Sequence, residues 1–404
     1  MSEKYTNQKI DLPEVDFQNQ LQIFFQTAIK SNKPLAIWKM PLKDAVNAIC
    51  QLDNSNNYPD ELETAPPGFF FVPFDTNDEG KSNFIKADII LNSKNNELSI
   101  HPTFNNSDLI DDFRAQFTSI QNSGFGRLSD FLSKSIAKGK EKAEFERLVT
   151  ESIDAINNGA YQKIVPSRIK SISLNDHFDP IKEFFKLCKE YTNAFISLVY
   201  VPSAGLWLGA TPELLLSIED KKTFRTAALA GTQSISRDFE LARAAWTQKE
   251  IEEQALVSRY IINCFKSIRL REFDEYGPKT VKAGNLIHLK TEFTVDMEAV
   301  NYPLLGTAML DLLHPTSAVC GMPMKPAAKF LSSKEGFDRE YFSGYLGPSN
   351  MDDSTNLFVN LRCMRIYKNK GILFAGAGVT EDSIPENEWL ETEMKFQTLL
   401  NVIN

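Results

Sequence analysis

The stretch Gln162-Lys163-Ile164-Val165-Pro166-Ser167-Arg168 opens an apolar segment directly after a helical pattern. Over residues 142–157 apolar side chains recur at helical spacing, and Asn158-Gly159 then supplies a stop signal. We therefore expect a strand from Lys163 to Ile172, with Lys163 just past a helix-to-strand turn. A lysine at such a position is either an exposed strand residue or a group held for chemistry.

The segments on either side of this stretch predict paired strands separated by long helices. The expected elements are an apolar hairpin (195–201 and 205–209), a strand (211–218), a long helix (237–268), a second hairpin (357–367 and 371–376), and a final helix that starts with a capping box at 383–386 and runs towards 402. This order favours an α+β or mixed α/β architecture with antiparallel sheets.

The composition is that of a globular protein large enough for a sizeable core. The chain has 404 residues, 42% hydrophobic and 24% charged, and a formal net charge of −9, which argues against general nucleic-acid binding. We find no signal peptide and no apolar stretch long enough for a membrane span. The five cysteines and four histidines show no metal-ligand spacing, so reduced thiols in the cytoplasm are expected.

Two pairs of glutamates recur at helical spacing. Glu250 and Glu253 are three residues apart, so their carboxylates leave the same helix face, and Glu388, Glu391 and Lys395 also share a face. Taken singly, either group fits an ordinary solvated helix surface. If the two groups faced each other they would suit Mg²⁺, which prefers oxygen ligands and keeps several waters.

Lys163 and Glu213 are candidates for proton transfer. A lysine that acts as general base needs a depressed pKa, which desolvation can supply. Glu213 follows Pro212 and precedes three leucines, an uncomfortable setting for a surface carboxylate, and burial would raise its pKa and suit a general acid. Arg362, in an apolar run, indicates a carboxylate partner that its fork could hold.

Taken together, the ordered motifs resemble the chorismate-utilising enzymes, most closely the isochorismate synthases. The motifs are KIVPSR, GATPELL, ALAGT, KEIEEQALV, HPTSAVCGMP, REYFSGYLG and LFAGAGVTEDSIPENEWLETEMK, spread over about 145–404. The resemblance implies a fold of two subdomains, each an antiparallel sheet with outer helices, and an active site between them. It divides the chain into a variable part of that fold, 1–140, and a chorismate-binding catalytic region, 141–404.

The resemblance also implies a role for each matching residue. Lys163 would be the base that activates water, and Glu213 the acid that protonates the departing 4-hydroxyl. Glu253 and Glu391 would ligate Mg²⁺ directly, with Glu250 and Glu388 acting through water, and the metal would hold the ring carboxylate of chorismate. The residues implied to bind the enolpyruvyl carboxylate are Tyr341, Arg362 and the Gly376 backbone, and those implied to line the remaining pocket are Gly231, Thr232, His288 and Lys395.

Three positions favour one activity within this family. Relatives that use ammonia typically carry glutamine in place of Lys163, aminodeoxychorismate enzymes of bacterial type carry lysine in place of Ala230, and salicylate synthases tend to carry threonine in place of Ala318. We therefore expect a cytoplasmic, Mg²⁺-dependent isochorismate synthase that acts on chorismate as a monomer without a glutaminase partner. The alternatives are a salicylate synthase, an anthranilate-type synthase and a non-catalytic chorismate-binding protein; both menaquinone and siderophore pathways stay open.

Overall fold

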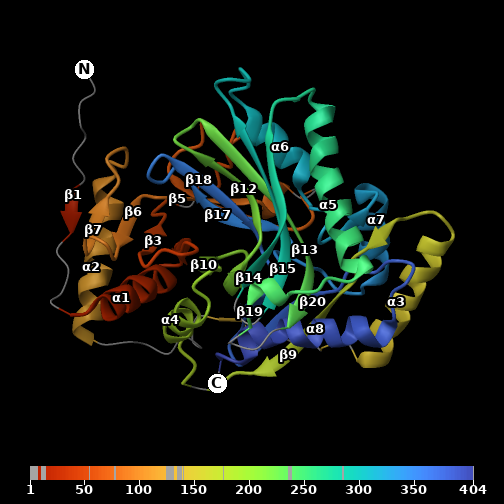
Figure 1. Cartoon of the computed structure of the whole chain (residues 1–404). Helices are drawn as coiled ribbons and strands as arrows, with labels where there is room; N and C mark the ends of the chain where they lie inside the picture. The colour runs from red at the N-terminus through yellow and green to blue at the C-terminus, as the bar shows by residue number, and fades with distance from the viewer. Residues whose placement is uncertain are drawn as a thin grey trace.

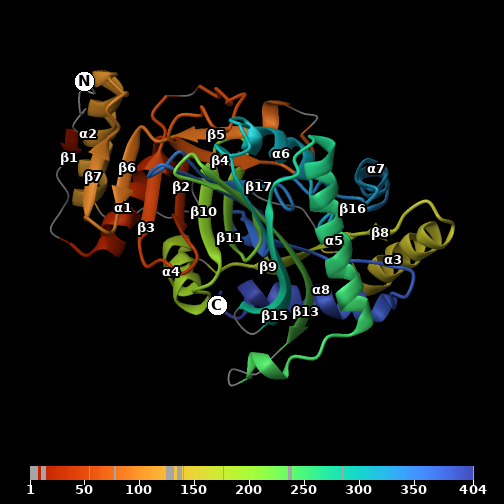
Figure 2. The same cartoon turned by 45° about the horizontal axis from the view of Figure 1, so that its top comes forward.

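Two antiparallel sheets packed face to face, with helices on their outer sides, form the computed structural model of the chain (Figures 1 and 2). The structure describes residues 8–10, 15–53, 55–76, 79–123, 132–133, 139, 141–175, 177–234, 239–283 and 286–403. In this described part, every strand pairing is antiparallel, as the paired apolar segments of the sequence predict.

The first sheet has ten strands and combines both ends of the chain. In spatial order these are β1 (Gln8–Ile10), β7 (Glu97–Ile100), β6 (Ile89–Asn92), β3 (Val46–Cys50), β2 (Leu35–Lys39), β10 (Phe195–Val201), β11 (Gly205–Thr211), β19 (Cys363–Ile366), β20 (Lys370–Gly376) and β9 (Ser167–Ser173). This order places β20 and β9 next to each other at one edge of the sheet. Strand β20 carries part of the small-residue segment, and β9 follows Lys163 in the chain.

The second sheet has eight strands. Their spatial order is β14 (Asp274–Ala283), β15 (Leu286–Asp296), β13 (Thr223–Ser234), β12 (Leu214–Glu219), β18 (Ser354–Val359), β17 (Tyr345–Ser349), β4 (Gly68–Val72) and β5 (Asn83–Lys86). A separate short ladder joins β8 (Lys163–Ile164) to β16 (Gly321–Met322). Both sheets therefore contain strands from the first hundred residues beside strands from the catalytic motifs.

Helices cover the outer faces of the two sheets. They are α1 (Phe17–Lys30), α2 (Ser107–Ser123), α3 (Lys142–Asn157), α4 (Pro180–Glu190), α5 (Gln248–Ser267), α6 (Leu305–Leu313), α7 (Met324–Lys334) and α8 (Pro385–Leu400). Helices α1, α2, α4 and α8 share one apolar core with the first sheet, and α5 and α6 share another with the second. In the described part of the chain, no helix is both long and apolar enough to cross a membrane.

A third apolar core lies between the sheets and is rich in aromatic rings. Phe195 stacks on Phe358 with ring centroids 4.2 Å apart, and Trp207 stacks on Phe374 at 5.3 Å. The first pair joins β10 of the first sheet to β18 of the second sheet. The second pair joins β11 and β20, which both belong to the first sheet. Fully burying an aromatic side chain of this size stabilises a fold by about 1.5–3 kcal/mol, so this layer holds the two sheets in one orientation.

Most expected elements form, and their differences from expectation have local causes. Pro166, which has no backbone N–H, divides the predicted Lys163–Ile172 strand into β8 and β9. The helix expected from residue 237 begins only at Gln248, where Thr247 caps it. The capping box expected at 383–386 is wrong: Ile384 is the N-cap of α8, and the Ser383 hydroxyl accepts a hydrogen bond from the Thr380 N–H instead.

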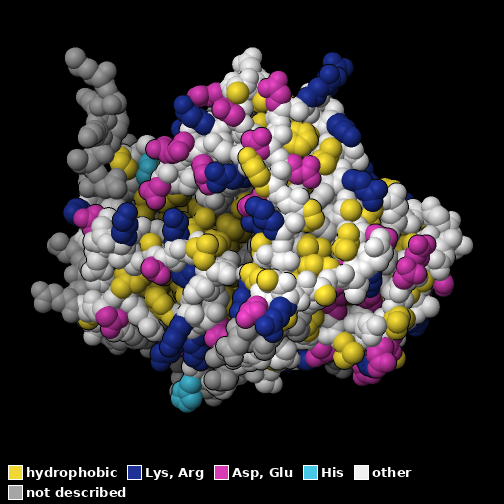
Figure 3. All heavy atoms as spheres, in the orientation of Figure 1, with side chains coloured by type: hydrophobic (Ala, Val, Ile, Leu, Met, Phe, Trp, Pro, Cys, Tyr) yellow, Lys and Arg dark blue, Asp and Glu magenta, His cyan; other side chains and the backbone are white. Residues whose placement is uncertain are grey.

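Acidic and basic side chains are interspersed on the face of the molecule seen in Figure 3. The five cysteines are all free, and Cys188 is the least buried of them. The free cysteines agree with the reduced thiols expected from the sequence.

Candidate active site

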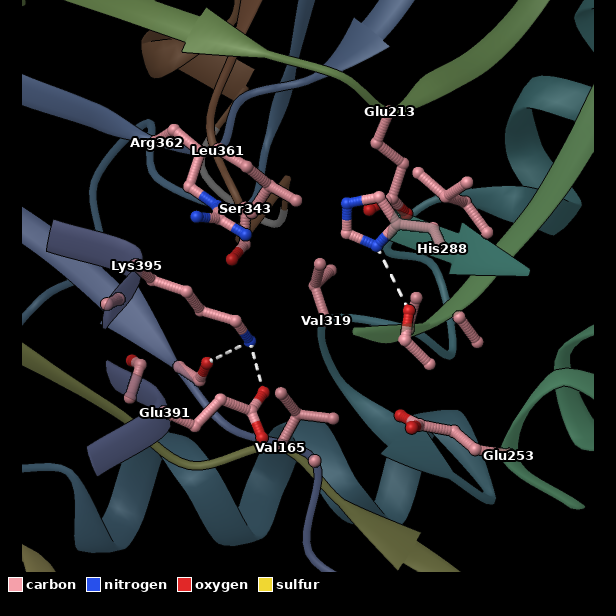
Figure 4. A pocket seen from close by; sticks show the side chains of 18 of the residues that line it. Val165, Glu213, Glu253, His288, Val319, Ser343, Leu361, Arg362, Glu391 and Lys395 are labelled. Atoms are coloured by element: carbon pink, nitrogen blue, oxygen red, sulfur yellow. Dashed lines mark hydrogen bonds and ion pairs between the residues drawn. The ribbon is translucent and has the colours of Figure 1, made fainter. Parts of the chain in front are cut away.

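A cavity of about 280 Å³ brings together segments that are far apart in the chain. Figure 4 shows its side chains converging from several elements, including α5, α8 and the strands of both sheets. The candidate residues of the sequence that line it are Lys163, Glu213, Gly231, Glu250, Glu253, His288, Ala318, Arg362, Gly376, Glu391 and Lys395. Tyr341 and Glu388 are not among its lining residues, and the side chain of Thr232 lies outside the described residues.

Lys163 is held in the cavity by backbone pairing on both sides. Its strand β8 pairs with β16, where Lys163 lies opposite Met322, and the Ile164 N–H donates to the Val379 carbonyl at 3.1 Å. The residue is 1% exposed, so the exposed-lysine alternative is wrong. Its ammonium lies 2.6 Å from a Glu253 carboxylate oxygen on α5.

Gly378 gives this ion pair the space that it occupies. A β-carbon at Gly378 would lie 3.0 Å from Glu253 Oε1 and 3.0 Å from Lys163 Cε, closer than almost all real contacts. The pair could not keep its present position beside a larger residue. The small-residue segment at 374–378 therefore permits a close side-chain approach at this position.

Three lysine–glutamate pairs lie at this end of the site. Lys395 contacts Glu391 at 2.7 Å within α8, and Lys249 of α5 contacts Glu388 of α8 at 3.1 Å. Burial works to raise the pKa of Glu253, but the charge and hydrogen bond of Lys163 outweigh it, and the pKa is lowered. The sequence analysis missed Lys249, although it directly precedes the Glu250 motif.

The carboxylates at this end have the donor chemistry that Mg²⁺ takes. Glu253 and Glu391 face the cavity from different helices, and burial together with the charge of Glu391 raises the pKa of Glu388. Acidic groups that repel each other in a buried setting are stabilised by a cation, a role that the three lysines fill in this structure. In the described residues, no three His, Cys, Asp or Glu side chains are arranged as a metal site.

Glu250 caps the N-terminus of α5. Its carboxylate accepts hydrogen bonds from the Thr247 N–H at 2.8 Å and from Gln233 Nε2 at 2.9 Å, completing a capping box. Glu250 still lines the cavity, but its oxygens are engaged with protein donors. Similarly, Glu388 is 1% exposed and pairs with Lys249, so it supports the site from behind the cavity wall.

Glu213 and His288 lie side by side at the opposite end (Figure 4). Burial raises the pKa of Glu213 to about 7, because the nearby positive charge of Lys163 lowers it by less than desolvation raises it. Burial, with the charge of Arg362, lowers the pKa of His288 to about 4, and its Nδ1 lies 3.0 Å from the Gly231 carbonyl. A neutral imidazole that donates from Nδ1 presents Nε2 as an acceptor.

Arg362 reaches the cavity from the turn between β18 and β19. Its backbone has a φ of +49°, and its Nη1 donates to Thr398 Oγ1 at 3.0 Å. Burial lowers the pKa of Arg362 to about 10, which still leaves the guanidinium charged at neutral pH. A buried cation of this kind favours an anionic ligand, as the sequence predicts. Next to it, Lys395 donates to the Gly376 carbonyl at 2.7 Å.

The structure places Tyr341 away from the cavity, contrary to the role implied by the resemblance. Its ring stacks on Phe71 at 4.1 Å, and its hydroxyl donates to the Lys81 carbonyl and accepts from Asn83 Nδ2, both at 2.8 Å. The next residues, Phe342 and Ser343, line the cavity in its place. Sequence reasoning missed both, although they belong to the same REYFSGYLG motif.

Comparisons with known proteins place the chain in a family. A family model described as chorismate binding enzyme matches residues 19–404. The isochorismate synthase EntC of Escherichia coli (strain K12) is 30% identical over 267 residues, which cover 65% of this chain and 67% of that protein.

Two solved structures share the fold over most of the chain. The menaquinone-specific isochorismate synthase MenF from Escherichia coli has a TM-score of 0.73 at 19% identity, covering 99% of this chain and 94% of that one. Anthranilate synthase component I from Streptococcus pneumoniae has a TM-score of 0.62 at 17% identity, covering 90% and 89%. These likenesses confirm the expected fold, which synthases of different chemistry share.

Proposed function

Because the chain belongs to the family of chorismate binding enzymes, we propose that it is an isomerase that converts chorismate into isochorismate. The observation that carries the proposal is the pairing, in one cavity, of a buried lysine with a carboxylic acid whose pKa is about 7. An acid and a base that line one pocket suit a displacement in which one hydroxyl arrives as another departs.

Glu213 and Lys163 would share the proton transfers of this reaction. Lys163 takes a proton from the water whose oxygen bonds to C2, the ring double bonds shift, and the C4–oxygen bond breaks. Glu213 gives its proton to the departing hydroxyl, which leaves as water, so that atoms and charge balance. For Lys163 to accept a proton, its ion pair with Glu253 has to open, because that pair stabilises the ammonium.

Arg362 and the lysines compensate the charge of a dianionic substrate. The protein carries a net charge of −9, so an anion enters only where local cations outweigh it. Arg362 and Lys395 both face the cavity and supply that charge. His288, neutral at physiological pH, offers an acceptor to a ring hydroxyl.

Mg²⁺ fits the carboxylate end of the cavity, and we propose Glu253 and Glu391 as its direct ligands, with Glu388 in support. When bound, the metal supplies a positive charge that holds the ring carboxylate of chorismate. The proposal is supported by the ion pairs of Glu253 with Lys163 and of Glu391 with Lys395, because in each the carboxylate already neutralises a positive charge.

Incubation of the purified protein with chorismate and MgCl₂, followed by chromatographic separation of the products, tests the proposal. We expect isochorismate without pyruvate and without a need for ammonia. Ala318 lines the cavity, and alanine at this position supports a reaction that ends at isochorismate. Salicylate plus pyruvate as main products would establish the salicylate synthase alternative, and binding without any product would establish the non-catalytic one.

The cellular context is also proposed from the chain's own features. Free cysteines fit the cytoplasm, and the cavity is complete within one chain, which fits a monomer that needs no glutaminase. Whether the product feeds menaquinone or a siderophore is a question for gene deletion with growth tests under iron limitation and under anaerobic respiration.

A further inference from the structure

Ser343 is a buried polar residue of the cavity that the mechanism above does not use. The residue is 1% exposed and lines the cavity. In the described part of the chain, its Oγ has no hydrogen-bond partner. An unpaired buried hydroxyl costs free energy. A bound ligand that accepts a hydrogen bond from the hydroxyl would remove that cost.

The backbone around Ser343 is fixed in a conformation that side chains disfavour. Its φ of +63° lies in the left-handed region. The Ser343 N–H donates to the Asn360 carbonyl at 2.9 Å, the Asn360 N–H donates to the Gly344 carbonyl at 2.8 Å, and the Asn360 side chain donates to the Tyr341 carbonyl at 2.8 Å. These bonds tie the loop to a residue two positions before Arg362, and so fix Ser343 relative to that guanidinium.

Ser343 lies beside Arg362 and faces the same hollow (Figure 4). A guanidinium leaves one or more carboxylate lone pairs unused, and a neighbouring hydroxyl can donate to one of them. Tyr341, the residue expected to supply a hydroxyl here, has both of its bonds satisfied elsewhere. The cavity therefore has one unassigned donor at the place where a second carboxylate would bind.

We propose that the Ser343 hydroxyl donates a hydrogen bond to the substrate carboxylate held by Arg362, the one on the enolpyruvyl arm; this inference rests on the proposed function. Ser343 is thus a specificity-determining residue. A ligand without that carboxylate leaves a buried hydroxyl unpaired, and sites built in this way reject such ligands strongly.

The variants Ser343→Gly and Ser343→Ala test this, because both remove the hydroxyl while only glycine also suits the positive φ. We expect both to raise the KM for chorismate roughly ten- to hundred-fold with kcat changed far less, the pattern of a lost binding contact to a charged group. The melting temperature of the ligand-free protein should stay equal or rise, because an unpaired group is removed. A merely structural serine would lower it.

Two controls sharpen the result. Inhibition by 4-hydroxybenzoate, a ring carboxylate without the enolpyruvyl arm, should be the same for wild type and both variants. Tyr341→Phe removes a hydroxyl outside the cavity, and should lower the melting temperature while leaving the KM unchanged. An unchanged KM in Ser343→Gly, or an equal loss of 4-hydroxybenzoate binding, would overturn the proposal.

Equilibrium dialysis with chorismate separates this inference from the proposed function. If wild type binds chorismate but forms no isochorismate, the proposed function fails, and a ten- to hundred-fold weaker dissociation constant in both variants would still support the role of Ser343. If wild type forms isochorismate and both variants bind chorismate normally, the function holds and the role of Ser343 fails.

Discussion

The two ends of the cavity differ in how their charges are satisfied. At the Lys163 end, Glu253, Glu391 and Glu388 each already have a lysine partner, and the contacts are 2.6, 2.7 and 3.1 Å long. At the Glu213 end, burial dominates: it raises the pKa of one carboxyl and lowers those of an imidazole and a guanidinium. The first end has its charges paired before any ligand arrives, whereas the second holds a buried guanidinium that a bound anion would stabilise further.

Replacing Lys163 should have the largest effect, because it disturbs both chemistry and stability. We expect Lys163→Gln to lose about 10²–10⁴-fold in kcat, the usual range for a general base. It also leaves Glu253 beside an uncharged partner, which should cost about 1–3 kcal/mol of unfolding free energy. Steady-state kinetics and urea denaturation measure the two effects.

A matched control for Lys163→Gln is Lys222→Gln, which removes a pair with Glu298 in which both side chains are exposed. Surface pairs contribute about 0–1 kcal/mol, so this variant should keep nearly normal activity and stability. Equal losses in the two lysine variants would contradict the special place given to Lys163.

Glu213→Gln should lose a similar factor of about 10²–10⁴ in kcat without the loss of stability. The pKa of Glu213 is raised to about 7 from an ordinary 4.5, so the folded state keeps the proton over a range in which the unfolded chain has released it. Glu213 therefore lowers stability progressively as pH rises from about 4.5 to 7, and glutamine removes that penalty. Denaturation at pH 5 and pH 8 should show the variant gaining on wild type at the higher pH.

The same group predicts a pH limb in wild-type activity. A general acid has to be protonated, so kcat/KM should fall as pH rises through about 7, where Glu213 ionises in the free enzyme. A kcat/KM that stayed constant up to pH 9 would remove Glu213 from this role.

Glu391→Gln sharpens the comparison at the Lys163 end. It removes one carboxylate from the proposed metal site and also the partner of Lys395. Mutation of residues that only hydrogen-bond to metal ligands already weakens metal binding about 10–100-fold. Loss of a direct ligand should therefore raise the Mg²⁺ concentration for half-maximal activity at least about tenfold. Titration calorimetry with Mg²⁺ alone gives an activity-independent reading, and an unchanged affinity would contradict the assignment.

Gly378→Ala should have the smallest effect. Its β-carbon would lie 3.0 Å from both Glu253 Oε1 and Lys163 Cε, so the ion pair must shift by a few tenths of an ångström. We expect a several-fold loss of kcat, since overpacking at a catalytic group displaces it. Gly371→Ala is the control: its β-carbon meets Ile172 Cγ1 and Met364 Sδ, each at 3.1 Å, outside the residues that line the cavity. Equal activity losses would show that the position of the strain does not matter.

The sequence predicted the main site residues because their motifs carry chemistry and position together. Lys163, Glu213 and Arg362 all reach the cavity as expected. The position of Tyr341 differs from expectation, because it depends on the direction in which the side chain points. Tyr341 and Ser343 belong to one motif, but the left-handed backbone at Ser343 and the bonds to Asn360 decide which of them faces the cavity.

One missed feature was readable from the sequence. Thr247-Gln248-Lys249-Glu250 has the spacing of a capping box, which would have placed the start of α5 correctly and identified Glu250 as a capping residue. By contrast, two of the three lysine–glutamate pairs could not be derived, because they join residues 90 and 139 positions apart, through the packing of both sheets.

The pairing of the N-terminal strands in both sheets affects how far the amino-acid sequence of this region can change while the fold is kept. Strand β2 pairs with β10 over Leu35–Lys39, and β4 pairs with β17 over Gly68–Val72, through backbone groups. A ladder of this kind recognises the main chain, so side chains can drift while the pairing persists. The part of the chain that carries β2 and β4 can thus differ in sequence from its relatives while its strands still pair in the same way. The fold match to MenF accordingly covers 99% of the chain. Excising the part that carries β2 and β4 would expose two open strand edges, a template for aggregation, so a shortened catalytic fragment should be recovered mainly as insoluble material.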